Sequence, residues 1–147
     1  MTDVERLAHL LRQPLRAGLY RLTCSVADLL GPAAQHAGLP ILDCDLASCT
    51  DKAGFLDCVG AALGFPDWFG RNWDALADCL GDMGWLPADG YVIVLASADR
   101  FRAAAEADFD TALEIFDEAA QDWARDGVPM WIFVDTAVSV AGLRDLV

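Results

Sequence analysis

Basic residues are scarce in this sequence, which holds 10 lysines and arginines against 23 aspartates and glutamates in 147 residues. The formal net charge is −13 at pH 7. Residues 1–30 carry four arginines against three acids, so the acid excess lies in the rest of the chain. A protein of this charge repels nucleic acids and anionic membranes and attracts basic partners. Acidity that only aids solubility is the alternative explanation.

Long hydrophobic runs are lacking as well. No apolar stretch approaches the ~20 residues that a membrane-spanning helix needs. Residues 1–18 alternate apolar and charged side chains, with Arg12 and Arg16 among them, and so lack the uninterrupted apolar core of a signal peptide. We therefore expect a cytoplasmic protein. Because 55% of the residues are hydrophobic, we expect an ordered chain with a core of its own.

Recognisable catalytic and metal-binding motifs are absent. The five cysteines form no CxxC or zinc-type spacing, so we expect most of them to be small buried hydrophobes rather than disulfide partners. The serines have no GxSxG or SxxK context, and no phosphate-binding glycine loop, EF-hand or HExxH occurs. His9 and His36 have no nucleophile motif nearby. We expect no cofactor and no enzyme; a carboxylate-dependent hydrolase is the enzymatic alternative.

Capping residues and apolar periodicity divide the chain into alternating helices and strands. Thr2 and Glu5 have capping-box spacing, and Ser25, Asn72 and either Thr50 or Asp51 can begin later helices. The expected helices cover residues 2–14, 25–36, 51–63, 72–82 and 107–125, the expected strands cover residues 19–22, 41–46, 91–96 and 130–135, and a last helical turn is expected in residues 140–147.

This alternation predicts the α/β class, with a small parallel sheet and right-handed crossovers. The run YVIVLA (residues 91–96) is continuously apolar, which is typical of a strand covered on both faces. We expect a single domain, residues 1–147, in which residues 1–39 add a β-α extension to a core of residues 40–135.

Acidic residues recur every four positions on two of the predicted helices. Like charges at this spacing destabilise a helix by roughly 0.2–0.5 kcal/mol per pair. Asp74 lies in the first turn, where an acid is favourable, but Asp78 and Asp82 approach the C-terminal end, where it is not. The first row therefore predicts a surface that faces a basic partner. The second row comprises Asp110, Glu114, Glu118 and Asp122.

Three tryptophans flank the first acid row. We expect Trp73 to face inward with Leu76 and Leu80. Trp68 precedes the helix in a glycine-containing turn and is the best candidate for an exposed aromatic side chain. Tryptophan is a frequent hot spot of protein interfaces. An acid row beside an exposed tryptophan predicts a surface shaped for a basic cleft.

The run FPDWFGRNWDALADCL (residues 65–80), followed by Trp85, resembles the signature of the barstar family, intracellular inhibitors of small secreted ribonucleases. The segments YVIVLA, IFDEA and WIFV continue the resemblance, which covers about residues 40–135. It implies a two-layer fold in which a three-stranded parallel sheet is packed with helices. In this chain we expect an extra N-terminal strand.

The resemblance also implies an inhibitory surface. In the family, a loop aromatic, the residues that begin the inhibitory helix, the acids of that helix and one acid of a later helix contact the ribonuclease. Trp73 stands at a leucine position of the family, and Ala77 stands where a contacting tryptophan is found. By position the residues are Trp68, Asn72, Trp73, Asp74, Ala77, Asp78, Trp85 and Glu118, and the acid row adds Asp82.

Two functions follow from these patterns. The first is an inhibitor of a ribonuclease, an immunity protein or antitoxin that inserts its acidic helix into the basic active-site cleft. The alternative is a barstar-like acidic binding module for a different basic toxin or a nucleic-acid-binding protein, which Ala77 favours. In both, the partner is a basic protein that supplies the missing positive charge.

Overall fold

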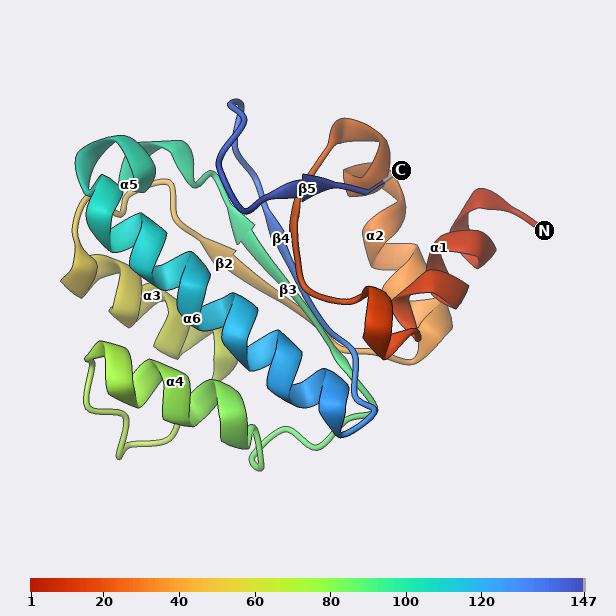
Figure 1. Ribbon diagram of the computed structural model, residues 1–147, viewed down its shortest axis with the longest axis horizontal. Helices are drawn as coiled ribbons and strands as arrows, with labels where there is room; N and C mark the ends of the chain where they lie inside the picture. The colour runs from red at the N-terminus through yellow and green to blue at the C-terminus, as the bar shows by residue number, and fades with distance from the viewer. Residues whose placement is uncertain (147) are drawn as a thin grey trace.

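A computed structural model describes residues 1–146, which form a five-stranded parallel sheet packed with helices (Figure 1). The strand order is β2-β3-β4-β1-β5, and every neighbouring pair is parallel. The predicted α/β class with a small parallel sheet is therefore confirmed. The strands are β1 (Leu19–Arg21), β2 (Ile41–Asp45), β3 (Tyr91–Ala96), β4 (Met130–Val134) and β5 (Arg144–Asp145). The helices are α1 (Asp3–Leu11), α2 (Cys24–Ala37), α3 (Lys52–Leu63), α4 (Trp73–Asp82), α5 (Asp99–Ala104) and α6 (Glu106–Arg125), with a short 3-10 turn η1 (Pro14–Arg16).

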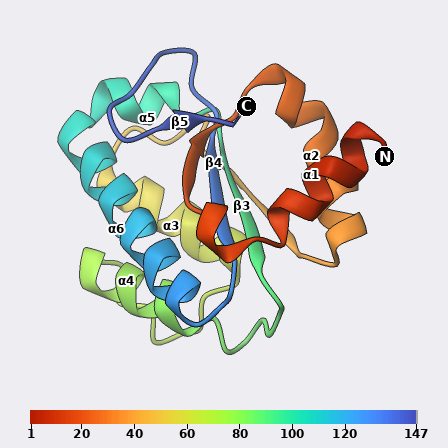
Figure 2. The same ribbon diagram turned by 45° about the vertical axis from the view of Figure 1, so that its right-hand side comes forward.

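The sheet is covered by helices on both faces. Successive side chains of a strand point to opposite faces. Ile93 and Leu95 of β3 therefore join the core formed with α3, α4, α5 and α6, whereas Val92 and Val94 join the core formed with α1 and α2. Figure 2 shows these two helical layers on either side of the strands. The prediction that YVIVLA is covered on both faces is confirmed.

The N-terminal extension is built into this sheet. As predicted, it contributes a strand, and β1 pairs with β4. The buried Trp131 of β4 donates its indole N–H to the carbonyl oxygen of Leu11, at 2.8 Å. Arg12 donates to the carbonyl oxygen of His36 at 2.8 Å, which ties the end of α1 to the end of α2. The extension thus adds a second helical layer to the two-layer arrangement of the core.

Three predicted helix starts are confirmed by their caps. Thr2 Oγ1 accepts a hydrogen bond from the Glu5 amide at 3.1 Å. Asp51 Oδ1 accepts from the Gly54 amide at 2.8 Å, so the cap of α3 is Asp51 rather than Thr50. Asn72 begins α4 in the same way. Each bond satisfies an amide that the first helical turn leaves without a partner.

Other local predictions are wrong. The N-cap of α2 is Thr23 and not Ser25. The tail forms β5 beside β1 instead of a helical turn, with residue 147 outside the described residues. Its Asp145 pairs with Arg21, Nε to Oδ1, at 2.9 Å. The short helix α5 (Asp99–Ala104) was not expected.

Of the helices in residues 1–146, none combines the length and the apolar character that crossing a membrane demands.

We propose that the extension and the core unfold together, and the Trp131 bond provides a test. Trp131→Phe removes the donor for Leu11 and shrinks a side chain that is fully buried. We expect the free energy of unfolding to fall by about 2–3 kcal/mol, since a buried carbonyl loses its partner and a void opens. Urea unfolding followed by circular dichroism measures the change.

The exposed Trp68 supplies the control, because Trp68→Phe should shift the free energy of unfolding by less than about 0.5 kcal/mol. An equal effect of the two substitutions, or a separate early transition for the extension, would contradict the proposal.

Candidate functional site

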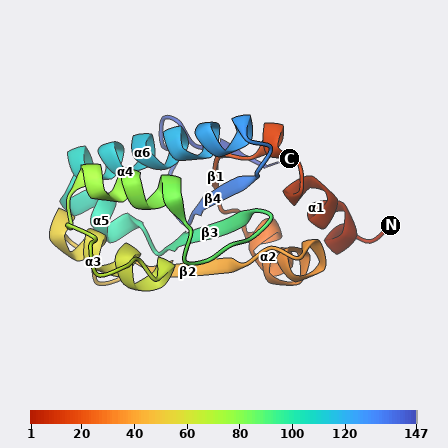
Figure 3. The same cartoon turned by 90° about the horizontal axis from the view of Figure 1, so that it is seen from below.

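The helices α4 and α6 lie side by side on one face of the sheet (Figure 3). Trp123 of α6 donates its indole N–H to the carbonyl oxygen of Leu80 in α4, at 2.7 Å. Between the exposed sides of the two helices lies a shallow cleft of about 110 Å³, called here the α4–α6 cleft. Its lining residues are Ala77, Gly81, Ile115, Glu118, Ala119 and Asp122.

Helix α4 has one buried and one exposed side. Asn72 caps its start, because Oδ1 accepts from the Ala75 amide at 2.7 Å. Met83 ends it in the left-handed conformation, with φ +50°. Leu76 and Leu80 are fully buried in the core. The exposed side consists of Asp74, Ala77, Asp78, Gly81 and Asp82.

The carboxylates of this surface lack cationic partners inside the described chain. Within residues 1–146, no arginine, lysine or histidine forms an ion pair with Asp74, Asp78, Asp82 or Glu118. Asp82 Oδ1 instead accepts a hydrogen bond from the backbone amide of Gly84, at 3.1 Å. The negative charge of the row is therefore exposed and uncompensated.

The negative charge of α4 acts on a thiol of the same helix, whereas one acid of α6 is neutralised. Burial, and then the neighbouring carboxylates of Asp78 and Asp82, raise the pKa of the Cys79 thiol. Asp122, across the cleft, does have a cationic partner, because Arg125, one turn later on α6, forms an ion pair with it. Unpaired acids of α4 and Glu118 of α6 therefore lie on the two sides of the cleft.

Two cations close to the start of α4 are engaged elsewhere. Arg71 pairs with Asp57 of α3, with Nε 3.3 Å from Oδ1. Lys52 Nζ lies 5.1 Å from the centre of the Trp73 ring, a distance typical of a cation–π contact. Neither cation neutralises the acid row.

The three tryptophans play different structural parts. Trp68 is 56% exposed, as expected, and its ring meets Trp85 edge-on with 6.2 Å between centroids. Trp85 is half-buried and donates its indole N–H to the carbonyl oxygen of Leu63 at 3.1 Å. Trp73 is half-buried against Phe55, at 6.2 Å between centroids. Of the three tryptophans, Trp68 is the most exposed to solvent, and the ring of Trp85 packs against it.

Sequence reasoning missed most of the cleft. Gly81, Ile115 and Ala119 line it, yet none was among the expected site residues. Gly81 follows Ala77 by four residues on α4, and Asp122 follows Glu118 by four on α6. This spacing was a usable signal, but it shows a cleft only once α4 and α6 are known to be neighbours.

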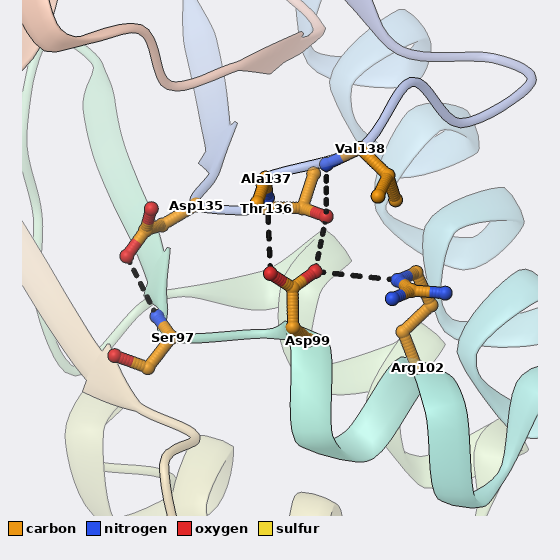
Figure 4. A network of polar contacts seen from close by, with 7 residues as sticks. All are labelled: Ser97, Asp99, Arg102, Asp135, Thr136, Ala137 and Val138. Atoms are coloured by element: carbon orange, nitrogen blue, oxygen red, sulfur yellow. Dashed lines mark hydrogen bonds and ion pairs between the residues drawn. The ribbon is translucent and has the colours of Figure 1, made fainter.

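A second hollow, of about 630 Å³, lies at the carboxyl ends of β1, β3 and β4. Ligands often bind at this edge of parallel sheets. Here the polar groups hold the loops to each other: Asp99 accepts from the hydroxyl of Thr136 and, at 3.0 Å, from the amide of Ala137 (Figure 4). Asp135 accepts from the Ser97 amide at 2.9 Å. The Thr136 bond is the main cause that lowers the pKa of Asp99. These hydrogen bonds connect the segment after β3 to the segment after β4.

Among the described residues, no group of three or more histidine, cysteine or acidic side chains is placed to hold a metal ion.

The comparisons with known proteins bear on this surface. The family model described as Barstar (barnase inhibitor) matches residues 39–135, which is about two-thirds of the chain. No curated protein matches the chain. The matched residues include Trp68, all of α4, the α4–α6 cleft and the strands β2, β3 and β4. The chain belongs to the barstar family.

Proposed function

We propose that this protein inhibits a ribonuclease by placing the exposed side of α4 in the enzyme's basic active-site cleft. The observation that carries the proposal is the row of exposed carboxylates on α4 without a cation in the described chain. The family, whose description names an inhibitor of barnase, supports the same conclusion. In this proposal the protein blocks an enzyme and catalyses no reaction itself.

The chemistry of the partner explains why carboxylates serve this purpose. A ribonuclease holds phosphates and stabilises developing negative charge with cationic side chains. Asp78 takes the place of a phosphate and accepts charge-assisted hydrogen bonds from those groups. Asp74, one turn earlier, and Glu118, across the cleft, flank it. Trp68 covers an apolar part of the enzyme's rim.

Binding also offsets the charge repulsion within α4 of the free protein. Asp74, Asp78 and Asp82 repel one another on the isolated helix, and the enzyme's cations turn this repulsion into attraction. The net charge of −13 extends the same effect to longer range, because it steers a basic partner during diffusional encounter. Short-range complementarity and long-range attraction thus act through the same surface.

The α4–α6 cleft favours a second candidate among partners. Ala77 and Gly81 leave a hollow of about 110 Å³ where the family's contacting tryptophan would stand. A complementary partner fills it with a protruding side chain. This observation favours a basic toxin or nucleic-acid-binding protein that differs from barnase, bound by the same acidic surface.

Coexpression separates the two candidates. The chain is expressed in cells together with each of several small basic ribonucleases, barnase included, and survival is measured against Asp78→Arg as the inactive variant. Rescue from one ribonuclease supports inhibition. Rescue from none, together with capture of another basic protein by the wild type and not by Asp78→Arg, supports the second candidate.

Among the acids, Asp78 should contribute most to binding. We expect Asp78→Ala to weaken the complex with the rescuing ribonuclease by at least about 2 kcal/mol, roughly 30-fold in Kd, because the enzyme's cations lose their acceptor. Isothermal titration calorimetry measures the loss. Asp110→Ala is the matched control, since it removes an exposed acid of α6 that is not among the expected partner-binding residues. Equal losses for the two variants would rule out a special role for Asp78.

Association should depend on salt. Raising the ionic strength from about 50 to 500 mM shortens the Debye length to a few ångströms, so the association rate should fall at least tenfold while the dissociation rate changes less. Stopped-flow mixing with the same ribonuclease gives both rates. An association rate that does not change with salt would show that charge is not what brings the partners together.

A larger side chain at Ala77 tests whether a partner fills the α4–α6 cleft. Ala77→Trp should fill the hollow and displace the partner's side chain, which weakens binding at least tenfold. The free energy of unfolding should change by less than about 0.5 kcal/mol, because Ala77 is exposed. Ala107→Trp, at an exposed position in the first turn of α6, is the control. Unchanged or tighter binding by Ala77→Trp would mean that the cleft stays empty in the complex.

A further inference from the structure

Two thiols lie next to each other between the end of β2 and helix α3. The Sγ atoms of Cys49 and Cys58 are 3.1 Å apart. Cys49 belongs to the loop that follows β2, and Cys58 lies on α3. A disulfide has an S–S length of about 2.05 Å, so the sulfur atoms need to approach by about 1 Å. The spacing of nine residues gives no disulfide signal in the sequence, and only the fold brings the pair together.

The two thiols differ in their access to solvent. Cys49 is 3% exposed, whereas Cys58 is half-buried and can meet a small reagent. Cys58 also lies 3.5 Å from the carbonyl oxygen of Asp45. A third thiol, Cys44, is 1% exposed and belongs to β2. The pair therefore has one accessible member and one sheltered member.

We propose that Cys49 and Cys58 are the site of a reversible intramolecular disulfide, formed when the protein meets a low-molecular-weight disulfide such as oxidised glutathione. The Cys58 thiolate attacks one sulfur of the reagent, forms a mixed disulfide and releases one glutathione thiolate. Cys49 then loses its proton to solvent and attacks Cys58 Sγ. The second glutathione leaves as a thiolate, and solvent protonates both released glutathiones. The two thiols are oxidised, and one glutathione disulfide is reduced to two thiols.

The bond would fasten the loop after β2 to α3. It closes a short loop of the chain, which restricts the unfolded state more than the folded one. We expect Tm to rise by roughly 5 °C on oxidation. The pair does not line the α4–α6 cleft, so this inference stands whether or not the protein inhibits a ribonuclease.

The second step should be slow at neutral pH. Burial, followed by the hydrogen bond and charge of Cys58, raises the pKa of Cys49 to about 12, and Asp45 and Asp51 act in the same direction. Cys44, a third thiol close by, is also held as a thiol, because burial raises its pKa to about 12. Below this pKa the thiolate fraction of Cys49 grows tenfold per pH unit. Closure of the disulfide should therefore accelerate about tenfold between pH 7 and pH 8.

Peptide mapping tests the assignment. The intact protein is incubated with oxidised glutathione, blocked with iodoacetamide and cleaved before aspartates, which places Cys44, Cys49 and Cys58 on separate peptides: residues 43–44, 45–50 and 57–66. We expect mass spectrometry to find residues 45–50 linked to residues 57–66, with release by a reductant.

Three variants sharpen the test. Cys49→Ser should stop at the mixed disulfide on Cys58, and Cys58→Ser should lose both products. Cys24→Ser, which removes an exposed thiol at the start of α2, should keep the cross-link. The proposal is overturned if Cys58 keeps glutathione in the wild type at pH 8, if the link goes to Cys44, or if both thiols remain free after the exposed Cys24 has reacted.

Discussion

In residues 1–146, the carboxylates of α4 form no ion pair with a cation, and this is the constraint on which the proposed function depends. Asp74, Asp78 and Asp82 lie one turn apart on an exposed surface, and their mutual repulsion opposes the helix. The helix persists because Asn72 caps its start and Leu76 is fully buried in the core. In the proposed complex, attraction to the partner's cations offsets this repulsion between the carboxylates.

The scaffold holds this surface in place through long-range contacts. The indole of Trp123 reaches from α6 to the carbonyl oxygen of Leu80, which fixes α4 beside α6. Buried side chains of both helices share one core with the strands β3 and β4. On the opposite face, α1 and α2 cover the second core, and Trp131 connects that layer to the sheet. The scaffold therefore holds the acids of α4 and Glu118 together as one pre-arranged surface.

Local signals predicted much of this fold, and tertiary contacts account for what they missed. The cap at Asn72, the exposed Trp68 and the doubly covered strand YVIVLA were each visible in a few neighbouring residues. The strand β5 spans two residues and exists through pairing with β1, and α5 is too short for periodicity to show it. The α4–α6 cleft and the Cys49–Cys58 pair arise where distant segments meet.

In the proposed complex, the partner's cations replace the counterions that α4 lacks. A double-mutant cycle that pairs Asp78→Ala with removal of each active-site cation of the bound ribonuclease measures this interaction directly. We expect a coupling energy of about 1–3 kcal/mol between Asp78 and at least one of those cations. Coupling energies below about 0.5 kcal/mol for every pair would contradict it.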